Sequence, residues 1–254
     1  MFRPRIIPVL LLRDRVLVKS IGFKDHKYIG DPINAVRIFN DLKADELIFL
    51  DIEASKNYRL VSLDFVKDVG EEARMPFGVG GGIRSIQDIR AITNAGAEKV
   101  VINTCAGQNP DFIRHAAETF GSTTIVVCID VKKKLFGGQR IWVLNGRVPT
   151  KFAPVDFAKL MEENGAGELI VQSVERDGTM QGYDVELIRS VSSAVSIPVI
   201  ALGGAGTCEH LGDAYRNGRA SALAAGSLFV YQNKKRGVLI NYPDKNERMV
   251  ESFE

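Results

Sequence analysis

The feature that most constrains the fold of this chain is a regular alternation between short apolar runs and longer amphipathic stretches. The apolar runs are rich in Val, Ile and Leu, and most contain few polar residues. Such runs are typical of parallel strands covered by helices, and the stretches between them are long enough to form those helices. We therefore predict eight strands, near residues 5–11, 46–52, 76–80, 98–103, 124–130, 168–173, 198–202 and 221–226.

Helix start signals lie between these strands, where a β/α alternation requires them. Asp31-Pro32 and Asn109-Pro110 each offer an N-cap side chain followed by proline at the first helical position, and Ser85 with Asp88 resembles a capping box. Eight β/α units in 254 residues match the size of one (β/α)8 TIM barrel, so we predict an α/β fold with a single domain over residues 1–254. A doubly wound sheet would need fewer strands or a second domain at this length.

The chain also repeats itself at an offset of 122 residues. This offset aligns Ala44-x-Glu46-Leu47-Ile48 with Ala166-x-Glu168-Leu169-Ile170, and Gly81-Gly82 with Gly203-Gly204. The period is much longer than that of a solenoid repeat and corresponds to four β/α units. We predict two half-barrels, about 1–122 and 123–254, that arose by duplication.

Each predicted half carries one glycine run between a strand and a helix. The runs extend from Val79 to Ser85 and from Leu202 to Thr207. Glycines let backbone N–H groups approach an anion closely, and the following helix directs its N-terminal N–H groups and positive dipole end to the same point. We expect each run to cradle a phosphate, and hence a substrate with two phosphates or two phosphorylated halves.

Composition argues against several classes of function. The net charge is only +2 and the basic residues look scattered, so we expect neither nucleic acid nor a membrane surface as a partner, unless folding creates a basic patch. Cys105, Cys128 and Cys208 lie far apart without C-x-x-C spacing, and the three histidines do not cluster, so we expect no disulfide framework, no metal and no cofactor. The N-terminal apolar run is too short for a signal peptide or a membrane span, which favours a cytoplasmic protein.

Two stretches interrupt the alternation. Lys19–Gly30 after the first strand and Lys132–Lys151 after the fifth are polar and contain glycine, so we predict two long loops. Both follow C-terminal strand ends, the face on which such barrels build active sites. Near the end of the chain, Pro243 opposes a long helix over Lys234–Pro243, so we predict a short final helix or irregular structure there.

Polar residues at the C-terminal ends of the predicted strands are the first candidates for chemistry. They are Asp51, Asn103, Thr104, Asp130, Ser173 and Asp177. Asp130 is the strongest candidate, because a carboxylate after an apolar run either has a buried partner or works as an acid or base. Lys19 either binds a substrate phosphate or is solvated on its loop. Asp177-Gly178-Thr179 has the composition of a turn.

Four charged residues stand at the opposite, N-terminal ends of the predicted strands. They are Arg5, Glu46, Lys99 and Glu168. Two are basic and two acidic, so we expect them to meet at the bottom mouth of the barrel. Residues on this face of a TIM barrel usually contribute to stability. By themselves, the four residues therefore favour a ring of salt bridges that closes the bottom of the barrel.

Many of these residues belong to stretches that match one known family over nearly the whole chain. The stretches are Arg5-Ile6-Ile7-Pro8, Gly30-Asp31-Pro32, Ala44-Asp45-Glu46-Leu47, Phe49-Leu50-Asp51-Ile52, Val79 to Ser85, Asn103-Thr104, Ile129-Asp130, Gly165-Ala166-Gly167-Glu168, Arg176-Asp177-Gly178-Thr179, Gly182-Tyr183-Asp184 and Gly203-Gly204-Ala205-Gly206. Together they resemble the cyclase subunit of imidazole glycerol phosphate synthase, the histidine-biosynthesis barrel that works with a glutaminase partner.

The resemblance implies roles for these residues. One phosphate would bind at Gly81-Gly82 with Asn103-Thr104, and the other at Gly203-Gly204 with Ala225-Gly226. We count Lys19, Asp51, Asp177 and Gly178 among the expected substrate-binding residues. The resemblance also implies that Arg5, Glu46, Lys99 and Glu168 form a gate through which ammonia from the docked glutaminase enters the barrel.

The chain departs from the family at the top of the barrel. The family pairs an aspartate at the end of strand 1 with the strand-5 aspartate as general acid and base; here Leu11 occupies the first position and only Asp130 remains. Gln172 stands where the family has threonine, and Leu202 where it has serine. A leucine cannot transfer a proton, so cyclisation should lose much of the factor of roughly 10²–10⁴ that one acid or base contributes.

We therefore predict a divergent paralogue that docks a glutaminase at its N-terminal face and conducts ammonia without closing the imidazole ring efficiently. The resemblance associates such paralogues with surface-polysaccharide biosynthesis, where the ammonia builds an acetamidino group on a sugar with a further ATP-dependent amidotransferase. Two alternatives stay open: an ordinary cyclase subunit that tolerates Leu11, and a scaffold or activator of the glutaminase that passes no ammonia. The related isomerase of the same pathway fits less well, because it also relies on paired aspartates and lacks the gate set.

Overall fold

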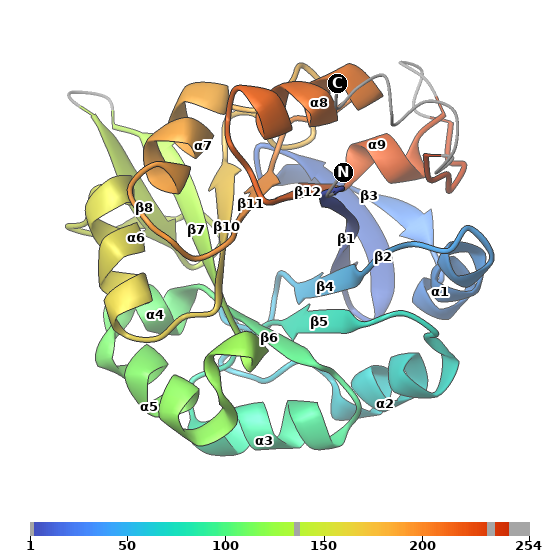
Figure 1. Cartoon of the computed structure of the whole chain (residues 1–254). Coiled ribbons are helices and arrows are strands. Elements are labelled where there is room, and N and C mark those ends of the chain that lie inside the picture. The colour runs from blue at the N-terminus through green and yellow to red at the C-terminus, as the bar shows by residue number, and fades with distance from the viewer. Residues whose placement is uncertain (1–2, 135–137, 233–236, 244–254) are drawn as a thin grey trace.

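The computed structural model describes residues 3–134, 138–232 and 237–243. Its centre is a closed ring of eight parallel strands with helices around the outside (Figure 1). The strands are β1 (Arg5–Arg13), β4 (Leu47–Asp51), β5 (Phe77–Gly80), β6 (Lys99–Ile102), β7 (Ile125–Lys133), β10 (Glu168–Ser173), β11 (Val199–Leu202) and β12 (Ala222–Ala225). The pairing of β10 with β7 closes the ring. The predicted (β/α)8 barrel and its eight strands are confirmed.

The helices cover the outer face of this ring. They are α1 (Pro32–Asp41), α2 (Leu63–Glu72), α3 (Ile86–Asn94), α4 (Thr104–Gln108), α5 (Asp111–Phe120), α6 (Pro154–Glu163), α7 (Val185–Ser192), α8 (Cys208–Arg216) and α9 (Ser227–Val230), with a 3₁₀ turn η1 (Ser122–Thr124). Of the predicted final stretch, residues 237–243 contain no helix, while residues 233–236 lie outside the described residues. None of the helices in the described ranges is long and apolar enough to cross a membrane.

Side-chain caps explain where several helices begin. Asp31 caps α1 by accepting the Asn34 N–H (2.8 Å), and Ser85 with Asp88 forms a reciprocal capping box at α3. The sequence predicted a helix with Asn109 as its N-cap and Pro110 as its first residue, and this start was wrong by one residue. Asn109 terminates α4 instead, and α5 begins after Pro110 without a side-chain cap.

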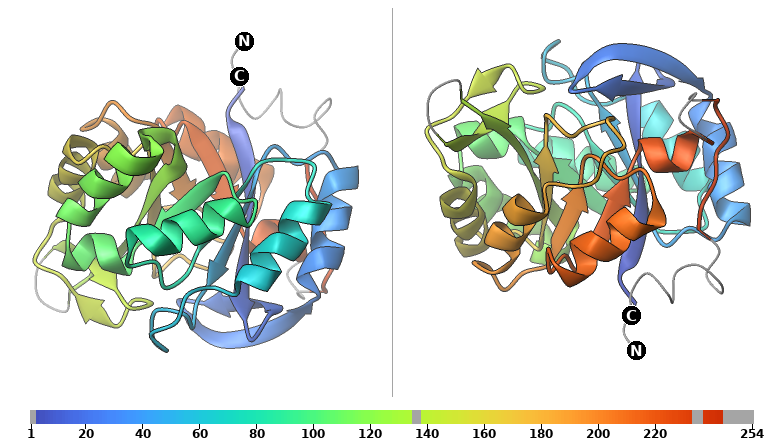
Figure 2. Two further views of the ribbon diagram at one scale, coloured as in Figure 1. Left: turned by 90° about the horizontal axis from the view of Figure 1, so that it is seen from below. Right: turned by 90° about the horizontal axis from the view of Figure 1, so that it is seen from above.

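The two predicted loops are β-hairpins that extend β1 and β7 beyond the barrel. β2 (Val16–Ile21) and β3 (Lys24–Gly30) follow β1, and β8 (Gln139–Val143) and β9 (Val148–Pro149) follow β7, all in antiparallel pairs. The loop prediction was wrong because the first turn has no glycine signal: Asp14 and Arg15 themselves take left-handed φ values of 51° and 64°. Figure 2 shows both hairpins at the end of the barrel opposite to the N-terminus.

The ring of strands separates two apolar cores. One lies between the strands and the helices and includes Phe39, Phe49 and Phe157. The other fills the inside of the ring, because side chains alternate along a strand and every second one faces inward. Its buried members are Ile7, Val9, Ile48, Val101, Val126, Cys128, Ile170, Ile200, Leu202, Ala222 and Ala224. The middle of the barrel is therefore apolar, with charged residues at one end and a partly polar ring at the other.

Candidate functional site

The four charged residues predicted at the N-terminal strand ends form a continuous ion-pair ring. Arg5 donates from Nη1 to Glu46 and from Nη2 to Glu168 Oε1 (2.7 Å). Lys99 Nζ donates to Glu46 Oε1 (3.0 Å) and to Glu168 Oε2 (3.2 Å). Each cation thus contacts both carboxylates. The Glu46 side chain is only 3% exposed, and its two cationic partners offset the cost of burying its charge.

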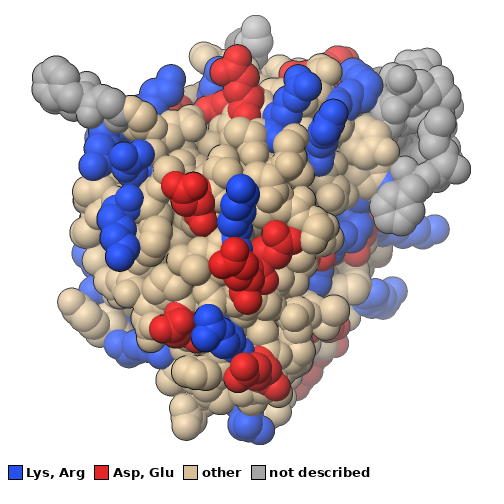
Figure 3. All heavy atoms as spheres, turned by 60° about the vertical axis from the view of Figure 1, so that its left-hand side comes forward, with Lys and Arg blue, Asp and Glu red and all other residues tan. Residues whose placement is uncertain are grey.

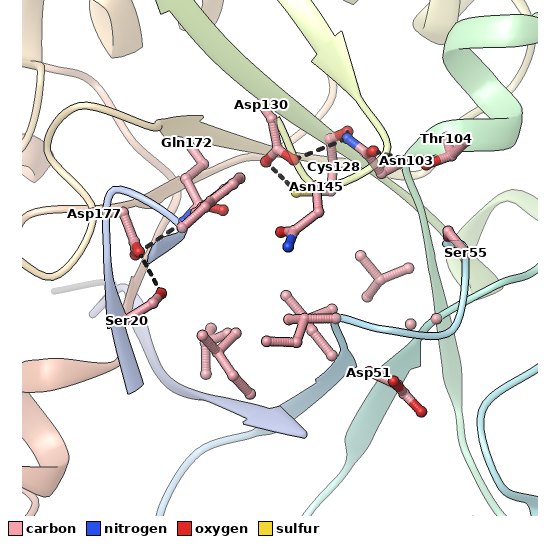
Figure 4. Close-up of a pocket in the computed structure, with 18 of the residues that line it drawn as sticks. Ser20, Asp51, Ser55, Asn103, Thr104, Cys128, Asp130, Asn145, Gln172 and Asp177 are labelled. Atoms are coloured by element: carbon pink, nitrogen blue, oxygen red, sulfur yellow. Dashed lines mark hydrogen bonds between the residues drawn. The ribbon is translucent and has the colours of Figure 1, made fainter. Parts of the chain in front are cut away.

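At the other end of the apolar interior, the last inward-facing residues form a ring with an apolar half and a polar half. Leu11 pairs with Leu50 on the next strand, and Leu202 lies on the same side across β12. Gln172 pairs with Leu202 in one direction and with Asp130 in the other. Figure 4 shows Gln172, Asp130, Cys128 and Asn103 along one wall of the pocket above this ring, facing carbon-only side chains across it, with Asp51 on the far side beside the carbon-only side chains.

Asp130 has the chemistry expected of an acid or base. It is 6% exposed, Cys128 Sγ lies 3.5 Å from Oδ1, and Asn103 Nδ2 donates to Oδ2 (3.3 Å). Burial raises the pKa of Asp130 from 3.8 to about 7, while the Cys128 thiol lowers it and the charge of Asp177 raises it further. The group can therefore hold or release a proton near neutral pH. Leu11, four strands away around the ring, offers no partner for that proton.

Lys19 is not a solvated loop residue, so that interpretation was wrong. It belongs to β2, is 6% exposed and lines the pocket. Its Nζ donates to Val9 O (2.6 Å) and lies so close to Gly226 that a Cβ there would overlap it. Burial lowers the pKa of Lys19 to about 8, and the charge of Asp177 opposes this shift. A cation is thus held inside the pocket, where an anionic ligand would meet it.

Asp177 ties the β2–β3 hairpin to the turn after β10. Ser20 Oγ donates to its Oδ2 (3.1 Å) and Gln172 Nε2 to its Oδ1 (3.1 Å), while the Gly22 N–H donates to its backbone oxygen (3.0 Å). Burial raises the pKa of Asp177, and Lys19 opposes this shift. Gly178 has φ 69°, and a Cβ there would overlap Ser20 O, so the turn needs glycine for steric reasons. The hairpin therefore lies across part of the pocket mouth.

Both glycine runs adopt backbone conformations that favour glycine. The φ values are 139° and 72° at Gly81 and Gly82, and 91° and 111° at Gly203 and Gly204. A Cβ at Gly204 would overlap Gly182 O, so close backbone packing is a second reason for glycine there. The pocket lining includes Gly81, Gly82 and Gly226, whereas Gly203, Gly204 and Ala225 are not among the described residues that line it.

The remaining predicted residues lie around the same pocket. Asp51 accepts two hydrogen bonds from Arg59, one of 2.6 Å, and two from N–H groups of the loop after β4 (both 3.1 Å), so it anchors that loop. Thr104 Oγ1 donates to Asn103 Oδ1 (3.3 Å) and accepts the Leu144 N–H (3.2 Å). These contacts organise the pocket wall from within the chain.

Sequence reasoning missed several pocket residues. Phe23 and His26 belong to the β2–β3 hairpin, and Asn145 to the turn between β8 and β9. Asn145 has φ 58° and its amide points into the pocket in Figure 4. A loop prediction for both segments does not locate their side chains. The Asn145-Gly146 pair, a known turn former, was the one available signal.

A closed ring of parallel strands with a pocket at their carboxyl ends defines a (β/α)8 barrel whose site lies where enzymes of this fold have theirs. A family model described as "Histidine biosynthesis protein" matches residues 5–235. The chain belongs to this family.

Individual relatives agree with that assignment. The chain is 45% identical over 247 residues (97% of this chain, 98% of the relative) to the Pseudomonas aeruginosa protein named "Putative imidazole glycerol phosphate synthase subunit hisF2". It is 40% identical over 249 residues (98% and 96%) to "Putative imidazole glycerol phosphate synthase subunit hisF3" of Vibrio vulnificus. It is 46% identical over 231 residues (91% and 92%) to "Imidazole glycerol phosphate synthase subunit HisF" of Alkaliphilus metalliredigens. The predicted resemblance to the cyclase subunit is confirmed.

Proposed function

We propose that this chain is the ammonia-conducting barrel of a glutamine amidotransferase complex. A glutaminase docks at the N-terminal face, its ammonia passes through the barrel, and a further ATP-dependent amidotransferase uses it for amidination of a sugar precursor. The observation that carries the proposal is an asymmetry between the two ends. The ion-pair ring is complete, whereas at the other end Leu11 stands where the resemblance expects one of the two acid/base groups.

The charged ring can act as a gate. Each of its cations bridges Glu46 and Glu168, so we expect the ring to close the mouth to water and ions while all contacts hold. Displacement of Lys99 would leave Arg5 in contact with both carboxylates, so each keeps one cationic partner while one side of the ring opens. Glutamine hydrolysis on a docked partner would deliver ammonia at this point.

The interior favours the neutral form of the cargo. Beyond the ring, the lining is aliphatic from Ile7 and Ile48 up to Leu11 and Leu202, apart from the Cys128 thiol. Burying an ammonium ion in such a lining costs several kcal/mol, whereas ammonia carries no charge. The replacements at positions 11 and 202 lengthen this apolar path to the pocket itself. We propose that the end of the barrel around Leu11 and Leu202 lets ammonia pass into the pocket and does not close the imidazole ring.

We propose a sugar precursor as the acceptor of the ammonia. It rests on the family resemblance, which associates paralogues without the strand-1 aspartate with surface-polysaccharide biosynthesis, and on Leu11 together. Lys19 and the Gly81-Gly82 run keep an anion-compatible wall in the pocket. A phosphorylated small molecule or another anion is the ligand class that this wall suits.

A second candidate is an ordinary imidazole glycerol phosphate synthase subunit. The pKa of Asp130 near 7 favours it, since one competent acid/base group remains. Expression in a histidine-requiring strain that lacks the cyclase separates the two: we expect no growth without histidine, and growth would refute the loss of cyclisation. Restoration of growth by Leu11→Asp would support the view that one substitution removed the activity.

A plugged barrel tests conduction itself. A Cβ at Gly78 of β5 would lie 3.5 Å from Ile48 Cγ1 and from Lys99 Cβ, an ordinary contact, so Gly78→Ala fits while Gly78→Val adds bulk beside the interior path. In the full complex, Gly78→Val should lower product formed from glutamine, with hydrolysis of glutamine and use of added ammonium salts unchanged. Gly78→Ala is the control.

The same assay addresses a barrel that only activates the glutaminase. Lys99→Met breaks two contacts of the ring, and under conduction it should uncouple glutamine hydrolysis from product formation. If neither Gly78→Val nor Lys99→Met changes the ratio of product to hydrolysed glutamine, the barrel conducts nothing and the scaffold alternative stands.

A further inference from the structure

The hairpin segment after β7 concentrates positive charge. Residues 131–155 contain no acidic residue and six basic ones: Lys132, Lys133, Lys134, Arg140, Arg147 and Lys151. Since the whole chain carries +2, the rest of it has a formal charge of −4. Composition suggested that the basic residues are scattered, but six of them gather in this one segment. We call the described part of this segment, residues 131–134 and 138–155, the basic hairpin.

The charges of the basic hairpin are free to meet a partner. None of the six residues forms an ion pair with a carboxylate within the described ranges. Lys133, Lys134 and Arg147 are exposed, and Lys132 lies over the Trp142 ring, 4.6 Å from its centroid. Figure 3, which brings the side of β8 and α6 forward, shows Lys and Arg side chains gathered at its left edge and acidic ones nearer the centre. Such a field attracts acidic partners.

The basic hairpin adjoins the pocket at the end of the apolar path. Leu144 and Asn145, at the turn between β8 and β9, line that pocket, and Val148 beside them is 44% exposed. Two tyrosines stand on other segments at this end of the barrel: Tyr28 on β3 is 67% exposed and Tyr58 in the loop after β4 is 80% exposed. Exposed tyrosines within a charged rim are typical of protein interfaces.

We infer that the basic hairpin is the docking surface for the enzyme that consumes the ammonia, a protein with an acidic surface around its own ammonia entrance. The inference rests on the proposed function. Ammonia released into water near neutral pH becomes ammonium, which is not a nucleophile, so the path must stay covered between the pocket and the next active site. A small anion or a nucleic acid on the hairpin would match its charge but would not receive ammonia.

Charge reversal tests this docking surface in the full chain bound to its glutaminase. Lys133→Glu with Arg147→Glu reverses two exposed charges on the basic hairpin, and Lys159→Glu with Arg189→Glu makes the same net change on α6 and α7. Association with the purified ATP-dependent amidotransferase is measured at low and at high salt. We expect the hairpin variant to associate about tenfold more slowly at low salt, the difference to shrink at high salt, and the control to behave as wild type.

The remaining outcomes overturn the inference in distinguishable ways. Equal association rates for both variants and wild type, in a complex that still transfers ammonia from glutamine, would remove the docking surface and leave the proposed function intact. A wild-type complex that transfers no ammonia from glutamine would remove the function as well. Binding of a short DNA duplex that only the hairpin variant loses, without amidotransferase binding, would assign the surface to nucleic acid instead.

Discussion

Replacing Asp130 with Asn should change how the stability of this barrel depends on pH. The pKa of Asp130 rises from 3.8 to about 7 on folding, because burial disfavours the charged carboxylate. Between these pH values the folded chain keeps a proton that the unfolded chain has lost, so this group's contribution is present at low pH and disappears as the pH rises through 7. At 1.36 kcal/mol per pH unit the full loss is about 4 kcal/mol, of which about 3 kcal/mol falls between pH 5 and pH 8.

Urea unfolding of the wild-type chain and of D130N from pH 5 to pH 8 measures this difference. The wild-type chain should lose about 3 kcal/mol of unfolding free energy that D130N keeps, since Asn has no proton to lose. Asp41→Asn, which changes an exposed carboxylate on α1, is the control and should follow the wild type. Parallel curves for wild type and D130N would refute the reasoning, because Asp130 would then carry its charge at neutral pH without penalty.

Three further substitutions test other parts of the structure. Leu11→Asp should lower stability more at pH 8 than at pH 5, because two carboxylates would then share one buried ring; equal losses at both pH values, measured by urea unfolding, would contradict this. Gly204→Ala should cost about 3 kcal/mol or more, since φ is 111° and the new Cβ meets Gly182 O, whereas Gly121→Ala, at φ 83° with nothing within 4 Å, should cost about 1 kcal/mol. Tyr242→Phe should cost about 1–2 kcal/mol by thermal unfolding, because its buried hydroxyl donates to Ile6 O (2.9 Å) and accepts the Asp45 N–H (3.1 Å).

The charged ring was predictable in position because strand periodicity is local. Glu46, Lys99 and Glu168 each stand two residues before an aliphatic residue of their own strand that faces the interior, namely Ile48, Val101 and Ile170. A period of two therefore places the charges on the same inner side. The distances between these charged groups could not be predicted, because they depend on the stagger between strands in the closed ring. The sequence of a single strand does not encode that stagger.

The pocket was harder to predict because its walls come from segments far apart in the chain. The burial of Lys19 results from contacts with Val9 O and with Gly226 after β12. Both hairpins are polar, as loops are, and the first turns at Asp14-Arg15 without glycine, so only Asn145-Gly146 of the second offered a turn signal. Antiparallel pairing along the free lengths of β1 and β7 satisfies their backbones, and such pairing is a tertiary property.

The sequence by itself determined the barrel and the family, and it carries the prediction that one acid/base group is missing, because apolar periodicity, cap residues and the identity of Leu11 are properties of short stretches. The tertiary structure alone decided that Leu11, Leu50 and Leu202 share one side of a ring whose other side holds Asp130 and Gln172. It also decided that, among the residues that the structure describes, the six basic residues of the basic hairpin form no ion pair with a carboxylate. Burial, pKa and charge pairing depend on neighbours supplied by distant strands. They exist only once the ring has closed.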